Sequence, residues 1–176
     1  MEQILLHICC GPCGTSVIER LHDTYRIHGY FFNPNIQPED EYNRRLESAC
    51  DVADYFGIPM TIADYDTGQY EEAVSGYEQE PENGARCLLC YRLRLEETAR
   101  FARDNGFSIF ASTLTLGPQK RASVINPIGH EIAGKYGLRF IDGDWKKQDG
   151  FKRSLELSRT LKLYRQKYCG CLLSIR

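Results

Sequence analysis

Several common features are missing from this chain of 176 residues, and each absence excludes a class of protein. No run approaches the roughly 20 consecutive apolar residues that a membrane-spanning helix needs. The amino terminus from Met1 has neither a basic leader nor a long apolar stretch before a cleavage site, so we expect a cytoplasmic protein without a membrane partner. No internal repeat, low-complexity segment or linker is present, which predicts one domain over residues 1–176.

A glycine-rich phosphate loop is also missing after the first predicted strand, where cysteines stand instead. Seven of the eight cysteines fall in three clusters: Cys9-Cys10-Gly-Pro-Cys13, Cys87-Leu-Leu-Cys90 and Cys169-Gly-Cys171. A chain of this length buries a core without covalent staples. In a reducing compartment, clustered thiols bind metals or exchange electrons more often than they form structural disulfides. The clusters therefore predict a metal or redox site.

Hydrophobic periodicity predicts strands that alternate with helices. We expect strands at 3–9, 27–32, 59–63, 108–112 and 138–141, and helices at 15–23, 39–56, 68–76, 86–104, 119–125, 128–136 and 150–166, with a loop at 78–84. Parallel strands need crossover connections, so this order predicts an α/β three-layer sandwich with a mostly parallel sheet. The first cysteine cluster follows the first strand, at the sheet edge where ligands gather.

The cysteine spacings favour a metal centre but leave alternatives open. Cys87 and Cys90 lie three residues apart at a helix start and share one face, as in half a zinc site, a redox dithiol or a pair of small apolar residues. Two ligands from each of the first two clusters would complete a cubane iron–sulfur cluster or a structural zinc site. Adjacent thiolates at Cys9 and Cys10 reach different irons more readily than one zinc, which favours iron–sulfur.

The remaining polar candidates are fewer. Cys169-Gly-Cys171 is suited to a strained, easily reduced disulfide, or the two residues are free thiols on a frayed terminus. Asp142 and Asp144 follow a predicted strand and are either an acid and oxygen ligand or turn and cap residues. We expect His7 to be a satisfied core histidine, and Cys50, alone on the apolar stripe of helix 39–56, to be a small core residue.

Charge is distributed unevenly along the chain. Residues 146–176 carry nine Lys or Arg and two acidic residues, a net +7, whereas residues 1–145 carry 13 basic and 22 acidic residues, a net −9. A basic carboxyl-terminal segment is typical of proteins that bind a polyanion such as RNA. The alternative is a solvated amphipathic helix.

Six stretches of the sequence together carry a family signature. They are Leu5–Cys13, Phe31–Ile36 with Glu41–Tyr42, Pro81–Cys90, Thr113–Leu114 with Pro118–Lys120, Asp144–Ser154 and Tyr164–Cys171. These stretches span nearly the whole chain and resemble the cobalamin-independent epoxyqueuosine reductases called QueH. The departures are mild, because Gly11 stands where Ala is common and Gly117 where Ser is common, and neither removes a thiol.

This resemblance implies an adenine-nucleotide α-hydrolase-like (HUP-type) fold and an oxidoreductase. The implied reaction is the two-electron deoxygenation of epoxyqueuosine to queuosine at the anticodon wobble position of tRNA, with electrons from an unidentified donor. Carried over by motif position, Cys9, Cys10, Cys87 and Cys90 would hold a [4Fe-4S] cluster beside a further metal ion, and Cys169 and Cys171 would be a redox-active disulfide pair.

Converting an epoxide to an alkene and water consumes two electrons, whereas a cubane cluster normally passes one at a time. We therefore expect a second metal ion, iron, near Cys13, met also by Asp142 or Asp144, where it binds the epoxide oxygen. The basic residues expected to meet tRNA phosphates are Lys152, Arg153, Arg159, Lys162, Arg165 and Lys167.

Two other classes use the same residues differently. A zinc-stabilised RNA-binding module would need the four cysteines only for structure. A pyrophosphatase-like nucleotide-binding enzyme would share the sheet. Such an enzyme binds phosphate with a glycine-rich loop after the first strand, and this chain has cysteines at that place.

Overall fold

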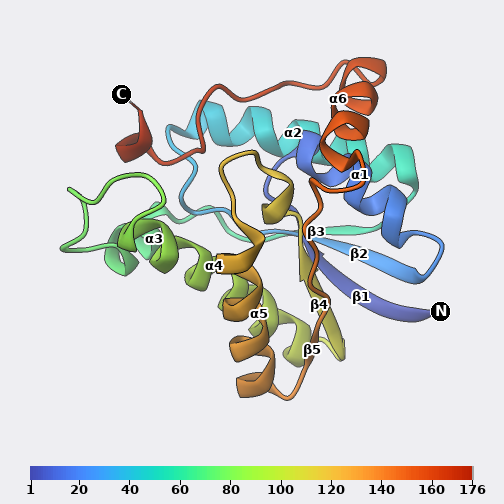
Figure 1. Ribbon diagram of the computed structural model, residues 1–176, viewed down its shortest axis with the longest axis horizontal. Coiled ribbons are helices and arrows are strands. Elements are labelled where there is room, and N and C mark those ends of the chain that lie inside the picture. The colour runs from blue at the N-terminus through green and yellow to red at the C-terminus, as the bar shows by residue number, and fades with distance from the viewer. Residues whose placement is uncertain (176) are drawn as a thin grey trace.

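The computed structural model describes residues 1–175 as a parallel sheet between two layers of helices (Figure 1). The strands are β1 (Glu2–His7), β2 (Tyr25–Phe31), β3 (Met60–Ile62), β4 (Ile109–Ser112) and β5 (Arg139–Phe140). The sheet has five strands in the order β3-β2-β1-β4-β5, and every neighbouring pair is parallel. The chain therefore adds β2 and β3 on one side of β1. It then crosses back and adds β4 and β5 on the other side of β1.

Helices connect all these strands. They are α1 (Gly11–Leu21), α2 (Glu39–Phe56), α3 (Thr67–Ala73), α4 (Ala85–Asp104), α5 (Ala122–Tyr136) and α6 (Gly150–Thr160), with short 3₁₀ turns at Leu114–Leu116 and Leu172–Ser174. Helices α1, α2 and α6 lie on one side of the sheet, and α4 and α5 lie on the other (Figure 1). The predicted three-layer α/β sandwich is confirmed.

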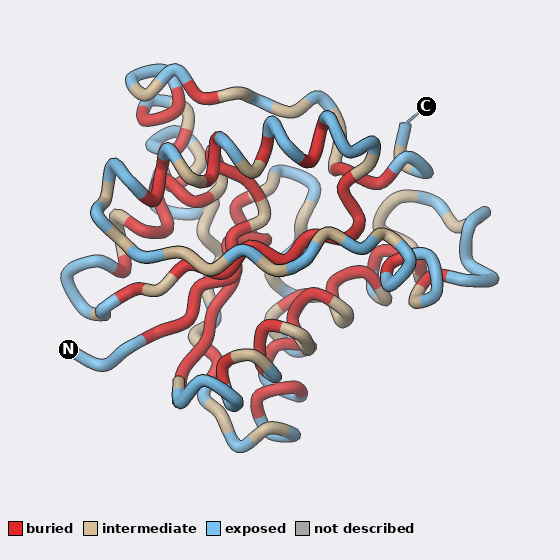
Figure 2. Tube along the Cα trace, turned by 180° about the vertical axis from the view of Figure 1, so that it is seen from behind, coloured by how far each residue is buried: buried red, intermediate tan, exposed pale blue. Residues whose placement is uncertain are grey.

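The sheet is the most deeply buried part of the molecule (Figure 2). The side chains of Ile4, Leu5 and Leu6 on the central strand β1 are fully buried, as expected for a strand covered on both faces. One apolar cluster joins β1 to α1 and α2 through residues such as Val17 and Val52, and a second cluster joins the opposite face to α4 and α5. Apolar packing on both faces of the sheet thus holds in place the helices that follow its strands.

Three sequence expectations about elements need correction. The first helix, expected at 15–23, is α1 over Gly11–Leu21, so Cys13 lies inside the helix rather than before it. The two helices expected on either side of Pro127 form the single helix α5, because packing of Ile125, Ile128 and Ile132 outweighs the hydrogen bond that proline cannot donate. The last long helix ends at Thr160, before the expected end at 166, because Lys162 takes a left-handed conformation with φ of 54°. The basic segment 146–176 is therefore mostly irregular, and Arg176 lies outside the described residues.

Cys50 is not a core residue. Its side chain is half-buried on α2, whereas the buried face of that helix carries Arg45, Ser48, Ala49 and Val52. Polar residues at Arg45 and Ser48 hid this face in the sequence. Within the described residues, no helix is both long and apolar enough to cross a membrane.

Candidate metal and redox centre

The first cysteine cluster lies where β1 passes into α1. Cys10 caps the helix: its sulfur accepts a hydrogen bond from the backbone N–H of Cys13 at 3.4 Å, and its carbonyl oxygen accepts from Gly14 at 3.1 Å. The amino end of α1 is therefore satisfied by cysteine atoms, at the place where a phosphate-binding loop would offer free N–H groups. This arrangement argues against the pyrophosphatase-like alternative.

The sulfurs of Cys9, Cys10 and Cys13 all lie within 4.8 Å of one another. Among residues 1–175, no other group of three or more His, Cys, Asp or Glu side chains comes this close. Hydrogen bonds from the neighbouring thiols hold the pKa of Cys9 well below its ordinary value, whereas burial raises the pKa of Cys10 to about 12. The three sulfurs thus form one compact donor set at the carboxyl edge of the sheet.

His7 precedes this cluster and behaves as expected from the sequence. Its ring is fully buried, and its nitrogens lie 3.0 Å from Ser112 Oγ and 2.9 Å from the carbonyl oxygen of Phe32. Burial, followed by the charge of Arg94, lowers the pKa of His7 to about 4. The histidine is a satisfied core residue that stays neutral at pH 7.

Cys87 and Cys90 lie in the first turns of α4 and are both buried. The sulfur of Cys87 accepts a hydrogen bond from the backbone N–H of Asn83 at 3.2 Å. Both cysteines line a small cavity together with Cys169 and Cys171. The second and third cysteine clusters of the sequence therefore meet in space.

A larger cavity of about 370 Å³ adjoins this small one. Cys9, Cys13 and Cys169 lie on its wall, and Cys169, Arg94 and Lys120 line both cavities. Its volume falls in the range of pockets that hold small organic ligands. Cysteines of the first and third clusters thus line one cavity that is large enough for a small organic group.

Within residues 1–175, two cations in this region form no ion pair with an acidic side chain. Arg94 is 4% exposed, and within the described chain its guanidinium forms no ion pair and its Nε has no hydrogen-bond partner. Lys120 is half-buried, and its Nζ lies 5.2 Å from the ring centroid of Tyr91. Burial acts to lower the pKa of Lys120, but the Tyr91 phenol and the Cys169 thiol raise it overall. Buried positive charge requires compensation, which thiolates or an anionic ligand would supply.

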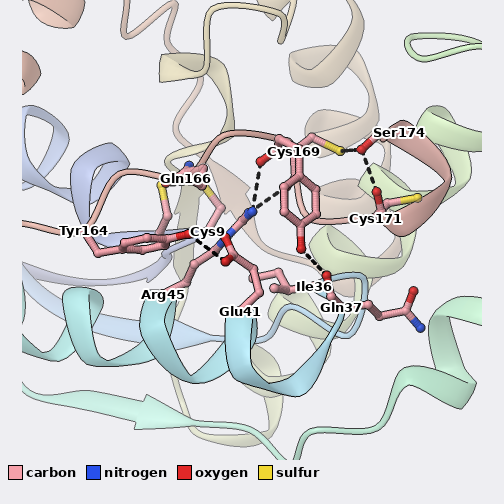
Figure 3. Close-up of polar contacts among 12 residues, drawn as sticks. Cys9, Ile36, Gln37, Glu41, Arg45, Tyr164, Gln166, Cys169, Cys171 and Ser174 are labelled. Carbon is pink, nitrogen blue, oxygen red and sulfur yellow. Dashed lines mark hydrogen bonds and ion pairs between the residues drawn. The ribbon is translucent and has the colours of Figure 1, made fainter. Parts of the chain in front are cut away.

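The carboxyl-terminal segment Tyr164–Cys171, here termed the strap, is bound to α2 (Figure 3). Arg45, which is 2% exposed, donates hydrogen bonds to the carbonyl oxygens of Tyr168 and Cys169, both at 2.9 Å. Glu41 pairs with Arg45 at 2.9 Å and accepts a hydrogen bond from the Tyr164 hydroxyl at 2.7 Å. One buried ion pair therefore fixes the strap that carries Cys169.

The strap also contacts the first cysteine cluster. Gln166 donates a hydrogen bond from Nε2 to the sulfur of Cys10 at 3.1 Å, and both Gln166 and Cys169 line the larger cavity. The sulfur of Cys169 lies 3.2 Å from Ser174 Oγ. Burial acts to raise the pKa of Cys169, but Lys120 and the Ser174 hydroxyl lower it overall. The sulfur of Cys171 instead accepts a hydrogen bond from the Tyr70 hydroxyl at 2.7 Å.

The acidic candidates lie outside the cysteine cavities. Asp142 pairs with His130 at 3.3 Å, and Asp144 pairs with Lys146 at 3.5 Å. Both line an open groove beside α5 rather than the cavity of Cys9 and Cys13. Their expected role at the metal therefore gains no support from the geometry.

The six basic candidates separate into groups. Arg165 and Lys167 line the larger cavity, and Arg153 forms a double hydrogen bond with Glu19 on α1. The remaining three, which do not line that cavity, are Lys152, Arg159 and Lys162.

The donor set fits a thiolate-bound metal group. Cysteine thiolates are soft ligands that suit iron–sulfur clusters and zinc. Three such sulfurs are gathered at the edge of a cavity, and two cations without acidic partners, Arg94 and Lys120, compensate the negative charge that metal-bound thiolates carry. The residues present are thus compatible with the cofactor expected from the sequence.

Sequence reasoning missed the polar residues that support this centre. Arg45 and Glu41 stand four residues apart on a helix, a spacing that also occurs on solvated faces, so their burial was hidden. Tyr70 gave no signal, because its role depends on a partner distant in sequence, and Arg94 gave none, because its burial beside both cavities arises from tertiary packing. Gln166 and Lys120 fell inside the family motifs but had no role assigned to them.

Comparisons with known proteins agree with this architecture. The sequence model of the family described as "Epoxyqueuosine reductase QueH" matches residues 4–176. Relatives of that name include a protein from Histophilus somni that is 40% identical over 99% of this chain and 73% of its own length. A protein from Streptococcus pyogenes is 39% identical over 96% of this chain and 69% of its own length. A Thermotoga maritima relative is 35% identical over 99% of this chain and 91% of its own length.

Solved structures share the fold at lower identity. A predicted tRNA methyltransferase subunit from Methanocaldococcus jannaschii has a TM-score of 0.56 at 15% identity, covering 90% of this chain and 75% of that protein. The U34-tRNA thiolase NcsA from Methanococcus maripaludis, solved with its [4Fe-4S] cluster, has a TM-score of 0.56 at 13% identity. This match covers 94% of this chain and 58% of the thiolase. The strand order and helical layers are those of the adenine-nucleotide α-hydrolase-like fold. Taken with the relatives above, the match over residues 4–176 means that this chain belongs to the epoxyqueuosine reductase QueH family.

Proposed function

We propose that this chain is an oxidoreductase that converts epoxyqueuosine in tRNA to queuosine by two-electron deoxygenation. Membership of the family supports the reaction and the substrate. We further propose that residues 1–176 act as one catalytic domain, since the strap carries cavity-lining residues back onto α2 and the first cysteine cluster.

One observation supports this proposal most strongly. The cavity of about 370 Å³ is lined by Cys9, Cys13 and Cys169 and also by the cationic residues Arg94 and Lys120. A cavity of this size accepts one ring system while the rest of a large substrate stays outside. A nucleoside extruded from an anticodon loop meets that requirement, because loop bases are readily splayed out of the stack.

The cofactor in this proposal is a [4Fe-4S] cluster held by Cys9, Cys10, Cys87 and Cys90. When bound, such a cluster supplies electrons one at a time. Thr113 supports the first of these ligands, because its hydroxyl lies 3.3 Å from the sulfur of Cys9 and accepts the Cys9 backbone N–H at 3.1 Å. Gln166 donates to Cys10, which orients that ligand.

A second metal ion, iron, remains part of the proposal, with Cys13 as its candidate ligand. Cys13 lines the larger cavity, which supports a role close to the substrate. Arg94 and Lys120 add positive charge where the epoxide oxygen develops negative charge as its C–O bond breaks. Lys120 keeps its proton at pH 7 and is placed to donate hydrogen bonds.

Nucleoside analysis tests the reaction directly. Anaerobically purified protein is incubated with epoxyqueuosine-containing tRNA and a low-potential reductant, and the digested nucleosides are separated by mass. We expect loss of one oxygen atom from the modified nucleoside, which requires both protein and reductant. Unchanged epoxyqueuosine with a fully loaded, reduced protein contradicts the proposed function.

Metal analysis separates this function from the zinc-stabilised RNA-binding module. A brown protein that contains both iron and acid-labile sulfide is the expected result. A colourless protein with zinc alone, which still binds tRNA, contradicts the reductase.

A further inference from the structure

The two cysteines of the Cys169-Gly-Cys171 motif have different surroundings. Cys169 lines the larger cavity and is half-buried, whereas Cys171 is 4% exposed and lines only the small cavity beside Cys87 and Cys90. Gly170 between them has a φ of 127°, in the region that favours glycine. Their sulfurs point in different directions, with that of Cys169 toward Ser174 (Figure 3). The motif therefore places Cys169 at the larger cavity and Cys171 at the small cavity only.

The buried thiol has one well-defined polar partner. Tyr70 on α3 is 2% exposed, and its hydroxyl lies 2.7 Å from the sulfur of Cys171. Within residues 1–175, this is the only hydrogen bond of the Tyr70 hydroxyl. Val74 and Cys90 pack around the pair, and both Tyr70 and Cys171 border the small cavity. Burial and the bond to Cys171 raise the pKa of Tyr70, which keeps the phenol protonated as the donor.

A hydrogen bond to sulfur does not stabilise both redox states equally. A reduced cysteine sulfur, above all a thiolate, is a better acceptor than a disulfide sulfur, and a buried hydroxyl that loses its acceptor costs free energy. A partner that stabilises the reduced form makes the disulfide more oxidising and easier to reduce. Tyr70 therefore favours the dithiol over the disulfide.

The family resemblance already implies that Cys169 and Cys171 form a redox-active pair. We propose that Tyr70 is a positioning residue that sets the thiol–disulfide equilibrium of this pair, with Cys169 as the thiol that exchanges electrons at the cavity and Cys171 as its buried partner. This inference rests on the proposed function for its biological purpose. Its physical content concerns only the dithiol and can be measured without tRNA.

The redox step balances with the proposed reaction. Oxidation of the pair breaks two S–H bonds, forms one S–S bond and releases two electrons and two protons. The epoxide accepts two electrons and two protons, loses both C–O bonds and leaves an alkene and water. A low-molecular-weight dithiol such as dithiothreitol then reduces the disulfide by exchange and restores the pair.

The sequence allows a site-specific measurement. Cleavage after Lys167 by trypsin releases Tyr168–Arg176, which contains Cys169 and Cys171 and no other cysteine. Cluster-loaded protein is equilibrated anaerobically in dithiothreitol buffers of graded oxidation, quenched by alkylation and digested, and the oxidised fraction of this peptide is read by mass. For Tyr70→Phe we expect the equilibrium constant to shift about tenfold toward the disulfide, equivalent to a potential about 30 mV lower.

Tyr55→Phe is the matched control, because it removes an exposed hydroxyl and keeps the ring. A Tyr70→Phe equilibrium within twofold of the parent, or an equal shift in Tyr55→Phe, overturns the role of Tyr70. The visible absorption of the cluster is recorded on the same samples, so that loss of folding is not mistaken for a redox effect.

Alkylation of the reduced protein tests the assignment of the two thiols. At limiting iodoacetamide, fragmentation of the same peptide should show Cys169 modified at least tenfold faster than Cys171. Equal rates, or faster modification of Cys171, overturn the assignment. Failure of the disulfide to form in any of the buffers also overturns the inference. The nucleoside assay tests epoxide reduction separately, so failure of this inference and failure of the proposed function can be told apart.

Discussion

Gly11 controls how closely the first turn of α1 approaches α2. A Cβ atom at this position would lie 2.1 Å from Ser48 Oγ and 2.5 Å from the Ser48 carbonyl oxygen. Both distances are far inside van der Waals contact, and one contact is with backbone, so the two helices must separate. We expect Gly11→Ala to lower the free energy of unfolding by about 1–3 kcal/mol, the range for overpacking, in urea titrations.

Gly14 provides the matched control on the same helix. Its added Cβ would meet only side-chain atoms, at 3.5 and 3.6 Å, which is ordinary contact. Gly14→Ala should therefore be neutral or stabilise by about 0.5–1 kcal/mol, because alanine has the higher helix propensity. If both variants lose equal stability, then the approach of Ser48 is not the cause.

Cys13 is the thiol of the first cluster whose role is least constrained by the sequence. Cys13 lines the larger cavity, whereas Cys10 does not. We expect Cys13→Ala to keep the visible absorption of the iron–sulfur cluster but to abolish queuosine formation, measured by spectroscopy and nucleoside mass on one preparation.

Cys50→Ala, a half-buried site on α2 away from the cavities, should retain both cluster absorption and activity. Loss of cluster absorption in Cys13→Ala would instead make Cys13 a cluster ligand, an outcome with a clear structural basis because its sulfur lies within 4.8 Å of Cys9 and Cys10.

Helix α2 and the strap form one structural unit through Arg45. Removing this guanidinium leaves Glu41 buried without its cation and frees the carbonyl oxygens of Tyr168 and Cys169. Breaking a buried ion pair costs about 3–5 kcal/mol. We therefore expect Arg45→Gln to lose about 3 kcal/mol in urea unfolding and to expose the strap to trypsin after Arg165 and Lys167.

Arg92→Gln is the comparison for Arg45→Gln. Arg92 pairs with Glu131 at the surface of the molecule, where an ion pair contributes about 0–1 kcal/mol. Similar losses in the two variants, or unchanged proteolysis of Arg45→Gln, would show that the strap is held by other contacts.

The elements of this fold were largely predictable, because each strand and helix carries a local signal. The apolar stripe of residues 39–56 predicts a helix with the bounds that α2 has. In the structure an acidic first turn begins this helix, and Gly57 in a left-handed conformation ends it. Pro127 suggested a helix boundary, but packing against the sheet overcomes the local cost of proline and α5 continues through it. The end of α6 was missed because Lys162, rather than a glycine, takes the left-handed conformation that follows the helix.

The candidate site was predictable only in part. The cysteine clusters follow from spacing, and the end of β1 follows from the strand pattern, so the position of the first cluster was expected. The contact of Tyr70 with Cys171 joins residues 101 positions apart, and the hydrogen bond of Arg45 to Cys169 joins residues 124 apart. No periodicity in the sequence encodes such pairs, because they arise from tertiary packing.

The charge of the whole molecule directs where tRNA is expected to bind. The acidic body repels phosphate, so binding depends on cations near the cavity that we propose as the nucleoside site. Arg165 and Lys167 line that cavity, Arg153 is engaged by Glu19, and Arg159 and Lys162 lie near the end of α6 and do not line it. The structure thereby ranks the six candidate residues that the sequence treated alike.

Affinity for tRNA across a salt series tests this ranking. Each phosphate contact contributes about 0.7–0.9 to the slope of log affinity against log salt, because binding releases counterions. The double variant Arg165→Gln/Lys167→Gln should therefore lower the slope by about 1.5 and weaken binding, whereas Arg159→Gln/Lys162→Gln, with the same change in net charge, should change the slope much less. Since both variants lose two charges, a general electrostatic effect predicts equal slopes, and only contacts at the cavity predict the difference. Equal slopes, or the larger loss in the α6 pair, would move the tRNA-binding surface from the cavity to the outer face of α6.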